Sequence, residues 1–184
     1  MKKILLSALV PLTALVLMSC SADSDNTSKA HSQAVKAATP DENAAPVVDP
    51  NFATSDLDGN QHTLNEWVGH RPVVVNLWGT WCPPCRREIP DLVALYKEFD
   101  GQVEIVSIAL ERKASPQQVK SFAEKAGMSW VHLLPSEDIL RFLRYDGGVP
   151  TTIFFDGKGR EINRHVGART YSVFKKDFEA IAGT

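Results

Sequence analysis

The chain has few cysteines and no excess of basic charge. Three of its 184 residues are Cys, and 20 Lys and Arg residues stand against 22 Asp and Glu residues, which gives a formal net charge of −2. A nucleic-acid-binding protein needs a basic surface, so this balance argues against nucleic acid as a partner. Glycine and proline, 11 residues each, are too sparse for a collagen-like chain. With 43% hydrophobic residues, the composition indicates one globular domain with appendages.

The amino-terminal hydrophobic run is too short for a comfortable membrane span. It extends from Ile4 to Met18, about 15 residues, whereas a membrane-spanning helix needs about 20. Lys2 and Lys3 precede it, and this order of charge and apolar core is typical of a signal peptide. We therefore expect residues 1–19 to be a signal peptide that is removed.

The run ends at Leu17-Met18-Ser19-Cys20, which resembles the lipobox of bacterial lipoproteins. The resemblance implies cleavage before Cys20 and lipid on its thiol, which would make the lipid bilayer a partner. Ser21, rather than Asp, in the next place is consistent with sorting to the outer membrane of a Gram-negative cell. A plain secretory signal with an incidental cysteine is the alternative. We expect an extracytoplasmic, periplasmic-side protein that is anchored through lipid.

Residues 20–46 lack the side chains needed for a packed core. Between Ser21 and Pro46, Val35 is the one larger aliphatic residue and no aromatic residue occurs. Such a stretch cannot bury enough apolar surface to offset the entropy of ordering it. We interpret it as a flexible, lipidated tether and expect the folded domain to occupy residues 47–184.

Strand and helix patterns alternate through that domain. A hairpin is expected at 52–64 around an Asp-Gly-Asn turn, and a second one at 151–166. The apolar run Pro72–Trp78 suits a central strand that is covered on both faces. Further strands are expected at 103–110 and 130–134, and helices at 137–145 and 171–181. Another helix is expected to begin at a Ser115 cap and to end at Gly127. The helix after the central strand should bury one stripe of residues, namely Ile89, Leu92, Val93, Tyr96 and Phe99. This order predicts an α/β layered domain with a mixed sheet.

The chemistry is concentrated in Trp81-Cys82-Pro83-Pro84-Cys85, between an expected strand and the helix after it. A helix start offers unpaired N–H groups and a positive dipole end, which stabilise a thiolate. A spacer of two residues lets the second thiol reach the first and close a disulfide. The pattern therefore favours a redox-active pair.

Three other interpretations of the two cysteines compete with this one. A structural disulfide across so short a loop would add only about 2 kcal/mol. A zinc half-site would need two more ligands, and the five histidines form no closely spaced pair. Two inert buried thiols are at odds with export, because free thiols oxidise there.

Residues Val73–Arg86 resemble the active-site segment of thioredoxin-fold thiol-disulfide oxidoreductases, in particular of their TlpA/ResA-like branch. Gly148-Val149-Pro150-Thr151 resembles the second signature of that family. The resemblance implies an α/β, thioredoxin-like three-layer fold with a central mixed sheet, an N-terminal β-hairpin and one inserted helix–strand unit. It also implies that the redox-active Cys82–Cys85 disulfide serves in place of any cofactor or metal.

The same resemblance assigns roles to individual residues. Cys82 would be the exposed attacking thiol and Cys85 the buried resolving one, with Trp81 packed beside the sulfurs. Pro150 would be cis and, with Val149 and Pro83, would contact the substrate, although an ordinary turn proline is the alternative.

Thioredoxin itself has a buried aspartate in its central strand, where this chain has Asn76. An amide cannot act as that base, so Asn76 is expected to be a hydrogen-bonded core residue. Glu111, at the end of the second expected strand, is our candidate for the base that deprotonates Cys85, although it could equally be a solvated strand-end residue.

The spacer also indicates the direction of electron flow. Pro83 and Pro84 have no N–H groups to offer the Cys82 thiolate, whereas Arg86 and Arg87 would favour it from exposed, screened positions. We expect a moderately lowered Cys82 pKa, hence a reductant. The family resemblance implies a membrane thiol electron donor and exported disulfide-containing substrates such as apocytochrome c.

Two rival functions are compatible with the cysteine pair. A peroxiredoxin-like thiol peroxidase would use Cys82 against peroxide, with a nearby threonine and arginine polarising the oxygens. Thr80 is close in sequence, but only Trp81 separates it from Cys82. A Cu(I)-delivery module would bind the metal through both thiolates, although Met128 is too distant in sequence to complete such a site.

Overall fold

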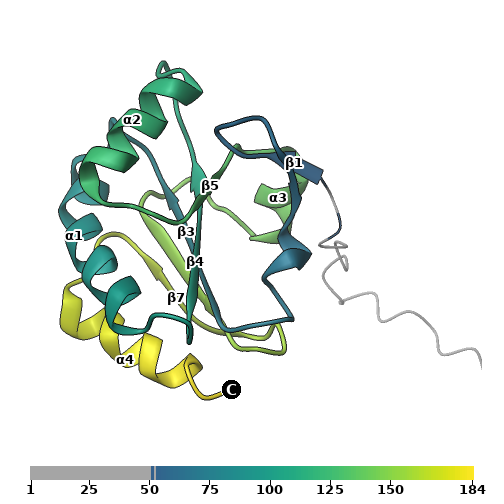
Figure 1. Ribbon diagram of the computed structural model, residues 1–184, viewed down its shortest axis with the longest axis vertical. Helices are drawn as coiled ribbons and strands as arrows, with labels where there is room; N and C mark the ends of the chain where they lie inside the picture. Colours follow the sequence, from purple (N-terminus) through teal and green to yellow (C-terminus); the bar gives the residue numbers. More distant parts are fainter. Residues whose placement is uncertain (1–50, 52) are drawn as a thin grey trace, which may run out of the picture. The chain divides into compact units, whose positions relative to one another are not determined.

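The computed structural model describes residue 51 and residues 53–184, which build a mixed five-stranded sheet in the order β5-β4-β3-β6-β7 (Figure 1). The central strand β3 runs parallel to β4 and antiparallel to β6. The strands are β3 (Val73–Trp78), β4 (Glu104–Ala109), β5 (Val131–Leu133), β6 (Thr151–Phe155) and β7 (Glu161–Val166).

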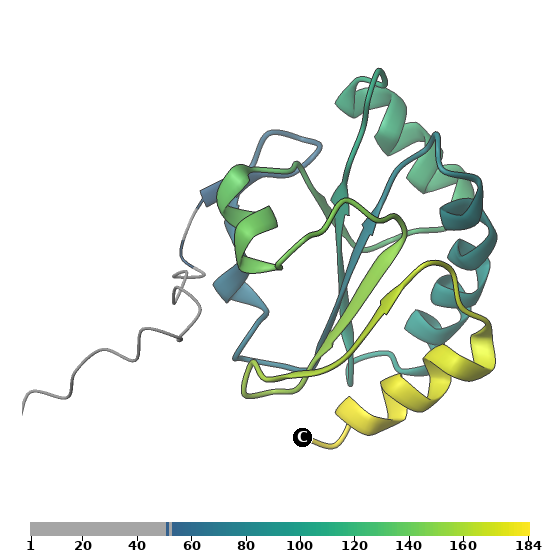
Figure 2. The same ribbon diagram turned by 180° about the vertical axis from the view of Figure 1, so that it is seen from behind.

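Helices cover both faces of this sheet (Figures 1 and 2). On one face lie α1 (Pro83–Glu98), α2 (Pro116–Ala126) and α4 (Tyr171–Ile181), and on the other lie α3 (Glu137–Phe142) and the short 3-10 helix η1 (Leu64–Glu66). The chain inserts α2 and β5 between β4 and α3, and β5 extends the sheet beyond β4. The predicted three-layer α/β fold with one inserted helix–strand unit is confirmed.

The predicted amino-terminal hairpin is also present, as β1 (Ala53–Ser55) and β2 (Gln61–Thr63). It attaches to the β5 edge of the sheet, where the Leu134 N–H donates to the Ser55 carbonyl at 2.7 Å. The Thr54 hydroxyl donates to the Leu134 carbonyl at 2.7 Å as well. The hairpin therefore covers backbone groups that an edge strand would otherwise expose.

Strand β3 lies in the middle of the core, as predicted from its apolar run. Val73, Val75 and Leu77 face the α3 side, while Val74 and Trp78 face the α1 side, and all five are fully buried. Asn76 shares the α1 side with them, which places a polar side chain under α1.

The predicted caps of α2 are confirmed, whereas the buried stripe of α1 differs from the prediction. Ser115 and Gln118 form a capping box, and Gly127 ends α2 with φ at 77°. In α1, Ile89 and Leu92 are buried as expected. Val93 and Tyr96 are half-buried, and the fully buried positions also include Cys85, Glu88 and Leu95.

The expected signal peptide, the lipidated Cys20 and the tether all lie outside the described residues, as do residues 47–50 of the predicted domain. Among the helices from residue 53 onward, none combines the length and the apolar character that a membrane crossing requires.

Candidate active site

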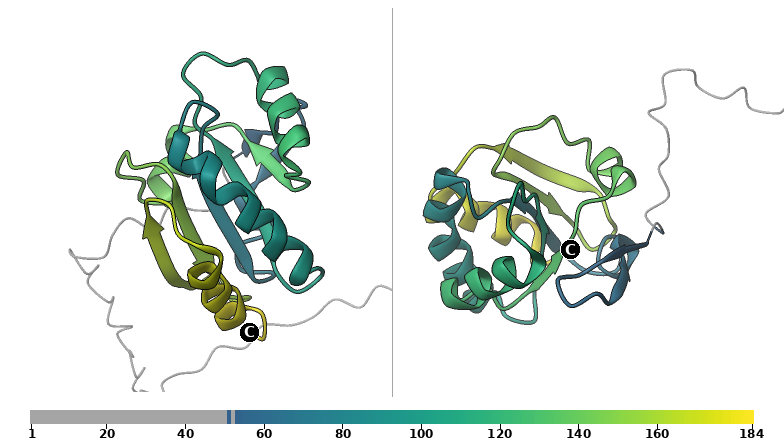
Figure 3. Two further views of the ribbon diagram at one scale, coloured as in Figure 1. Left: turned by 90° about the vertical axis from the view of Figure 1, so that its left-hand side faces the viewer. Right: turned by 90° about the horizontal axis from the view of Figure 1, so that it is seen from above.

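The two cysteines form a disulfide at the amino-terminal end of α1, with a sulfur–sulfur distance of 2.10 Å. Cys82 is the N-cap of the helix, and its Sγ accepts a hydrogen bond from the Cys85 backbone N–H at 3.2 Å. Pro83 and Pro84 contribute no N–H, so this single donor reaches the sulfur within the motif. The helix start is the position at which backbone donors and the dipole favour a thiolate. Figure 3 shows α1 along the sheet from two further directions.

The expectation of an exposed Cys82 is wrong for this oxidised form. Cys82 is 2% exposed and Cys85 is fully buried, because both sulfurs join the hydrophobic core on the α1 side of the sheet. Trp81, by contrast, is 38% exposed, and Pro83 is exposed as well. The residues that flank the disulfide therefore form the accessible surface of the site.

The loop after β4 holds the segment before Cys82 in place. The Trp81 indole N–H donates to the Leu110 carbonyl at 2.8 Å, and the Arg112 guanidinium carbon lies 3.9 Å from the Trp81 ring centroid. Glu111 accepts from the Thr80 backbone N–H at 2.6 Å and from the Thr80 hydroxyl at 2.9 Å. Glu111 thus lies at the site, but both of its carboxylate oxygens accept hydrogen bonds from Thr80. Its role as a base for Cys85 stays a prediction.

The Val149–Pro150 peptide bond is cis, as the resemblance implied. Pro150 is buried and its carbonyl accepts from the Gly167 N–H at 2.8 Å, while the Thr151 hydroxyl donates to the Gly148 carbonyl at 2.7 Å. Val149 packs against the core cluster that contains both cysteines. The structure therefore fixes the shape of this loop near the disulfide, and the substrate contacts of Val149, Pro150 and Pro83 stay predictions.

A buried carboxyl that the sequence analysis missed lies below the disulfide. Glu88 is 2% exposed and follows Cys85 by three residues on α1, which places both side chains on one face of the helix. Its Oε1 accepts from the Asn76 amide at 3.1 Å, and the same amide nitrogen donates to the Thr152 hydroxyl at 3.0 Å. Asn76 is thus a hydrogen-bonded core amide.

The environment of Glu88 shifts the pKa of its carboxyl. Burial raises the pKa of this carboxyl to about 7, although the Asn76 hydrogen bond and the nearby Arg169 lower it in part. A carboxyl that titrates near neutrality can both hold and accept a proton at ordinary pH. The spacing of Cys85, Glu88, Leu92 and Leu95 on one helix face was the signal in the sequence that could have revealed its burial.

Comparison with known proteins places this arrangement among disulfide oxidoreductases. Residues 47–178 match the model of the AhpC/TSA family. The chain is 34% identical over 134 residues to the thiol-disulfide oxidoreductase ResA of Geobacillus thermodenitrificans, which covers 72% of this chain and 75% of that protein. It is 31% identical over 134 residues to the thioredoxin-like protein YneN of Bacillus subtilis, covering 71% and 74% respectively.

A solved structure shows the same fold. The thiol:disulfide interchange protein of Chlorobium tepidum TLS superposes with a TM-score of 0.64 at 28% identity, over 76% of this chain and 99% of that one.

Proposed function

This chain belongs to the AhpC/TSA family and is a thiol-disulfide oxidoreductase, and from that premise we propose that it reduces disulfides of exported proteins outside the cytoplasm. The observation that carries the proposal is the Cys82–Cys85 disulfide at the start of α1. We propose Cys82 as the attacking thiol and Cys85 as the resolving one, with Trp81 beside the sulfurs and Val149, Pro150 and Pro83 at the substrate.

The reaction is a two-step thiol-disulfide exchange. The Cys82 thiolate attacks one sulfur of a substrate disulfide, which forms a mixed disulfide and releases the other substrate sulfur as a thiolate. The Cys85 thiolate then attacks the Cys82 sulfur, closes the Cys82–Cys85 disulfide and releases the second substrate thiolate. Two electrons pass from the cysteine pair to the substrate, and the released thiolates take up protons. A membrane thiol donor would restore the reduced pair.

The Pro-Pro spacer supports the reductive direction. Strong oxidants of this class stabilise their reduced, thiolate form. Here Cys85 supplies one N–H to the Cys82 sulfur, and the two prolines cannot add others. A less stabilised thiolate gives up electrons more readily, which suits a reductase. Measurement of the reduction potential against glutathione tests this, and a potential near that of a strong oxidant would contradict it.

The resolving step needs a group that takes the Cys85 proton. We propose that a carboxyl does so, either Glu111 as the sequence suggested or Glu88, whose burial raises its pKa to about 7. Glu88 is the better placed, since it shares a helix face with Cys85 while Thr80 engages both Glu111 oxygens.

The proposed location depends on the amino-terminal segment. Leu17-Met18-Ser19-Cys20 supports lipid attachment at Cys20, and the polar stretch behind it supports a tether that keeps the domain near membrane partners. Fractionation of cells that express wild type and Cys20→Ser tests the anchor. Release of the variant from the membrane fraction is expected, and equal retention of both proteins would contradict it.

The substrate is best identified by trapping. Cys85→Ser should accumulate mixed disulfides at Cys82, which non-reducing electrophoresis and mass spectrometry can identify, with the Cys82→Ser/Cys85→Ser double variant as control. Exported proteins such as apocytochrome c are expected among the captured partners. Failure of the wild type to reduce insulin, together with rapid consumption of hydrogen peroxide, would favour a peroxidase instead.

A further inference from the structure

A groove of about 530 Å³ opens beside Trp81, between the loop after β4 and the start of α2. Trp81, Ala114 and Phe122 supply apolar surface, and Arg112 and Lys113 supply positive charge. Because Trp81 directly precedes Cys82, a peptide whose cysteine is attacked at Cys82 can extend into this groove.

The two cations of the groove are available to a ligand. Within the part of the chain that the structure describes, neither Arg112 nor Lys113 has an ion-pair partner, and both are exposed. The Arg112 guanidinium lies over the Trp81 ring, and none of its N–H groups donates a hydrogen bond among the described interactions, so they are available to a ligand.

Glu111 is the one carboxylate among the described residues that line the groove. Both of its oxygens accept from Thr80, and it forms no ion pair with Arg112 or Lys113 among the described interactions. Arg86 and Arg87, exposed on the first turns of α1, add further positive charge. Arg112, Lys113, Arg86 and Arg87 thus outnumber Glu111 here, which gives this part of the described chain an excess of positive side chains, although the whole chain carries a net charge of −2.

We propose that this groove binds an acidic peptide segment next to the target cysteine of the protein substrate. A carboxylate of the segment would bind Arg112 and Lys113, and an apolar neighbour would pack on Trp81 and Phe122. Arg112 is suited to this contact because a guanidinium edge matches a carboxylate with two parallel hydrogen bonds. The inference rests on the proposed function, since the segment belongs to the disulfide substrate, and it adds a preference among substrates.

Two disulfide peptides of equal length test the proposal, one with Glu-Phe and one with Lys-Phe beside the cysteine. Wild type should reduce the Glu peptide with a kcat/KM about tenfold higher at low salt, mainly through KM, and high salt should shrink the difference. Arg112→Gln and Lys113→Gln should each reduce the preference severalfold, Arg112→Lys should retain part of it, and Lys97→Gln, at the far end of α1, should retain all of it.

The variants separate the effect of losing a positive charge in the groove from the effect of moving the Trp81 indole. Lys113 makes no contact with Trp81 among the interactions described, so its substitution keeps the test valid even if Arg112→Gln moves the indole. Equal kcat/KM values for both peptides, or the same loss in Lys97→Gln, would overturn the acidic-segment inference and leave the reductase intact. Failure to reduce insulin or either peptide would contradict the proposed function itself, and the inference with it.

Discussion

The Asn76 amide donates a hydrogen bond to Glu88 Oε1 at 3.1 Å, and both side chains are buried beneath the disulfide helix. The central strand of this chain therefore contributes an amide, and the acid lies on α1 instead. Oε2 of Glu88 lacks a hydrogen-bond partner of good geometry among the described residues, and burial outweighs the contributions of Asn76 and Arg169 that favour the charged form. This pair makes the site sensitive to pH in two separable ways.

The first prediction concerns stability. Because the pKa of Glu88 rises from 4.5 to about 7 on folding, the fold favours its protonated form. That contribution is fully present below about pH 4.5 and is lost as pH rises through 7, a change of about 3 kcal/mol at most. Glu88→Gln should therefore unfold at higher urea concentration than wild type at about pH 8.5 and at a similar concentration near pH 5. The control Glu124→Gln, on an exposed face, should leave the pH dependence of the free energy of unfolding unchanged. If the free energy of unfolding of Glu88→Gln followed a pH curve parallel to that of wild type, the prediction would be contradicted.

The second prediction identifies the base for Cys85. If Glu88 takes the Cys85 proton, Glu88→Gln should slow the resolving step by roughly 100-fold and remove a titration near pH 7 from its pH–rate profile. Glu111→Gln should lower the rate at all pH values alike, because it loosens Thr80 without removing the proton acceptor. Stopped-flow measurement of mixed-disulfide resolution distinguishes them. Loss of the titration in Glu111→Gln alone would establish Glu111 as the base.

The fold could be predicted from the sequence because its signals are local. The apolar run of β3, the Ser115 cap and the Asp-Gly turns each specify their element within a few residues. Glu88 escaped prediction because it follows Arg86 and Arg87, two exposed charges, and its burial depends on Asn76 and Thr152 from distant strands. The helical spacing of Glu88 with Cys85, Leu92 and Leu95 could indicate a buried position, but local periodicity does not indicate its partners on the distant strands.

The exposure of Cys82 was predicted wrongly for a similar reason. A thiol at a helix start has unpaired donors around it, but its accessibility depends on the elements packed across it. Here the disulfide joins the core that includes Trp78 and Phe154 from two separate strands. Trp81 is instead the exposed residue next to the disulfide, and its position depends on Leu110 and Arg112 after β4.

The third prediction tests that placement of Trp81. A Cβ atom at Gly79 would lie 2.6 Å from the indole Nε1 and 2.9 Å from the Leu110 carbonyl, where the indole hydrogen bond forms. Gly79→Ala should displace Trp81, lower kcat/KM for insulin reduction about tenfold and destabilise the fold by roughly 1 to 3 kcal/mol. Gly183→Ala, which meets no atom within 4 Å, serves as the control. Unchanged activity in Gly79→Ala would show that the indole position is irrelevant to exchange.

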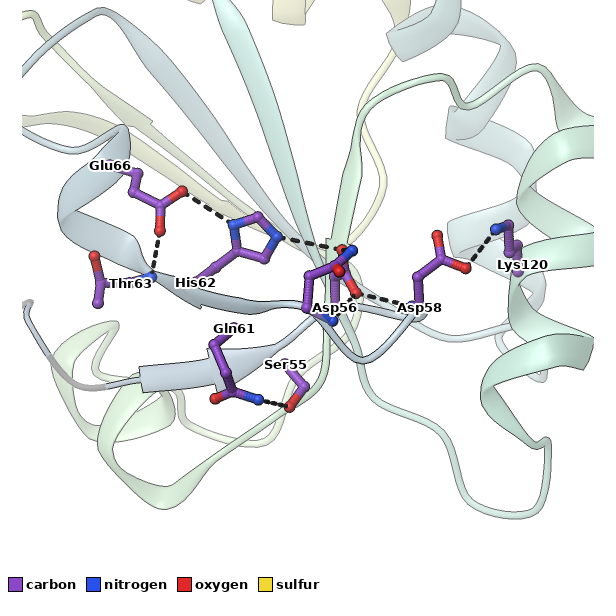
Figure 4. Close-up of polar contacts among 9 residues, drawn as sticks. Ser55, Asp56, Asp58, Gln61, His62, Thr63, Glu66 and Lys120 are labelled. Carbon is purple, nitrogen blue, oxygen red and sulfur yellow. Dashed lines mark hydrogen bonds and ion pairs between the residues drawn. The ribbon is translucent and has the colours of Figure 1, made fainter.

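The last prediction concerns the hairpin, where His62 lies between two carboxylates (Figure 4). Its Nδ1 is 3.0 Å from Glu66 Oε2, and its Nε2 is 3.2 Å from Asp56 Oδ2. Hydrogen bonding to Glu66 raises the pKa of His62 above its ordinary value, burial opposes this, and Asp56 adds to the increase. Burial likewise opposes ionisation of Asp56, but hydrogen bonds from Asn60, Asp58 and His62 outweigh it and lower its pKa to about 2.

The raised pKa of His62 determines how its contribution to stability changes with pH. The carboxylates are ionised above about pH 4, and the stabilisation from protonated His62 is full below pH 6.5 and lost as pH rises through its raised folded value. His62→Gln should therefore destabilise the protein by roughly 1 kcal/mol more at about pH 5.5 than at pH 8.5 in urea unfolding. Loss of the His62 stacking on Trp67, whose ring centroid is 5.5 Å away, is common to both conditions and cancels in that difference.

His70→Gln, at an exposed position, should show no such difference. An equal destabilisation by His62→Gln at both pH values would mean that packing, and not the charge between the carboxylates, is what His62 contributes to the hairpin.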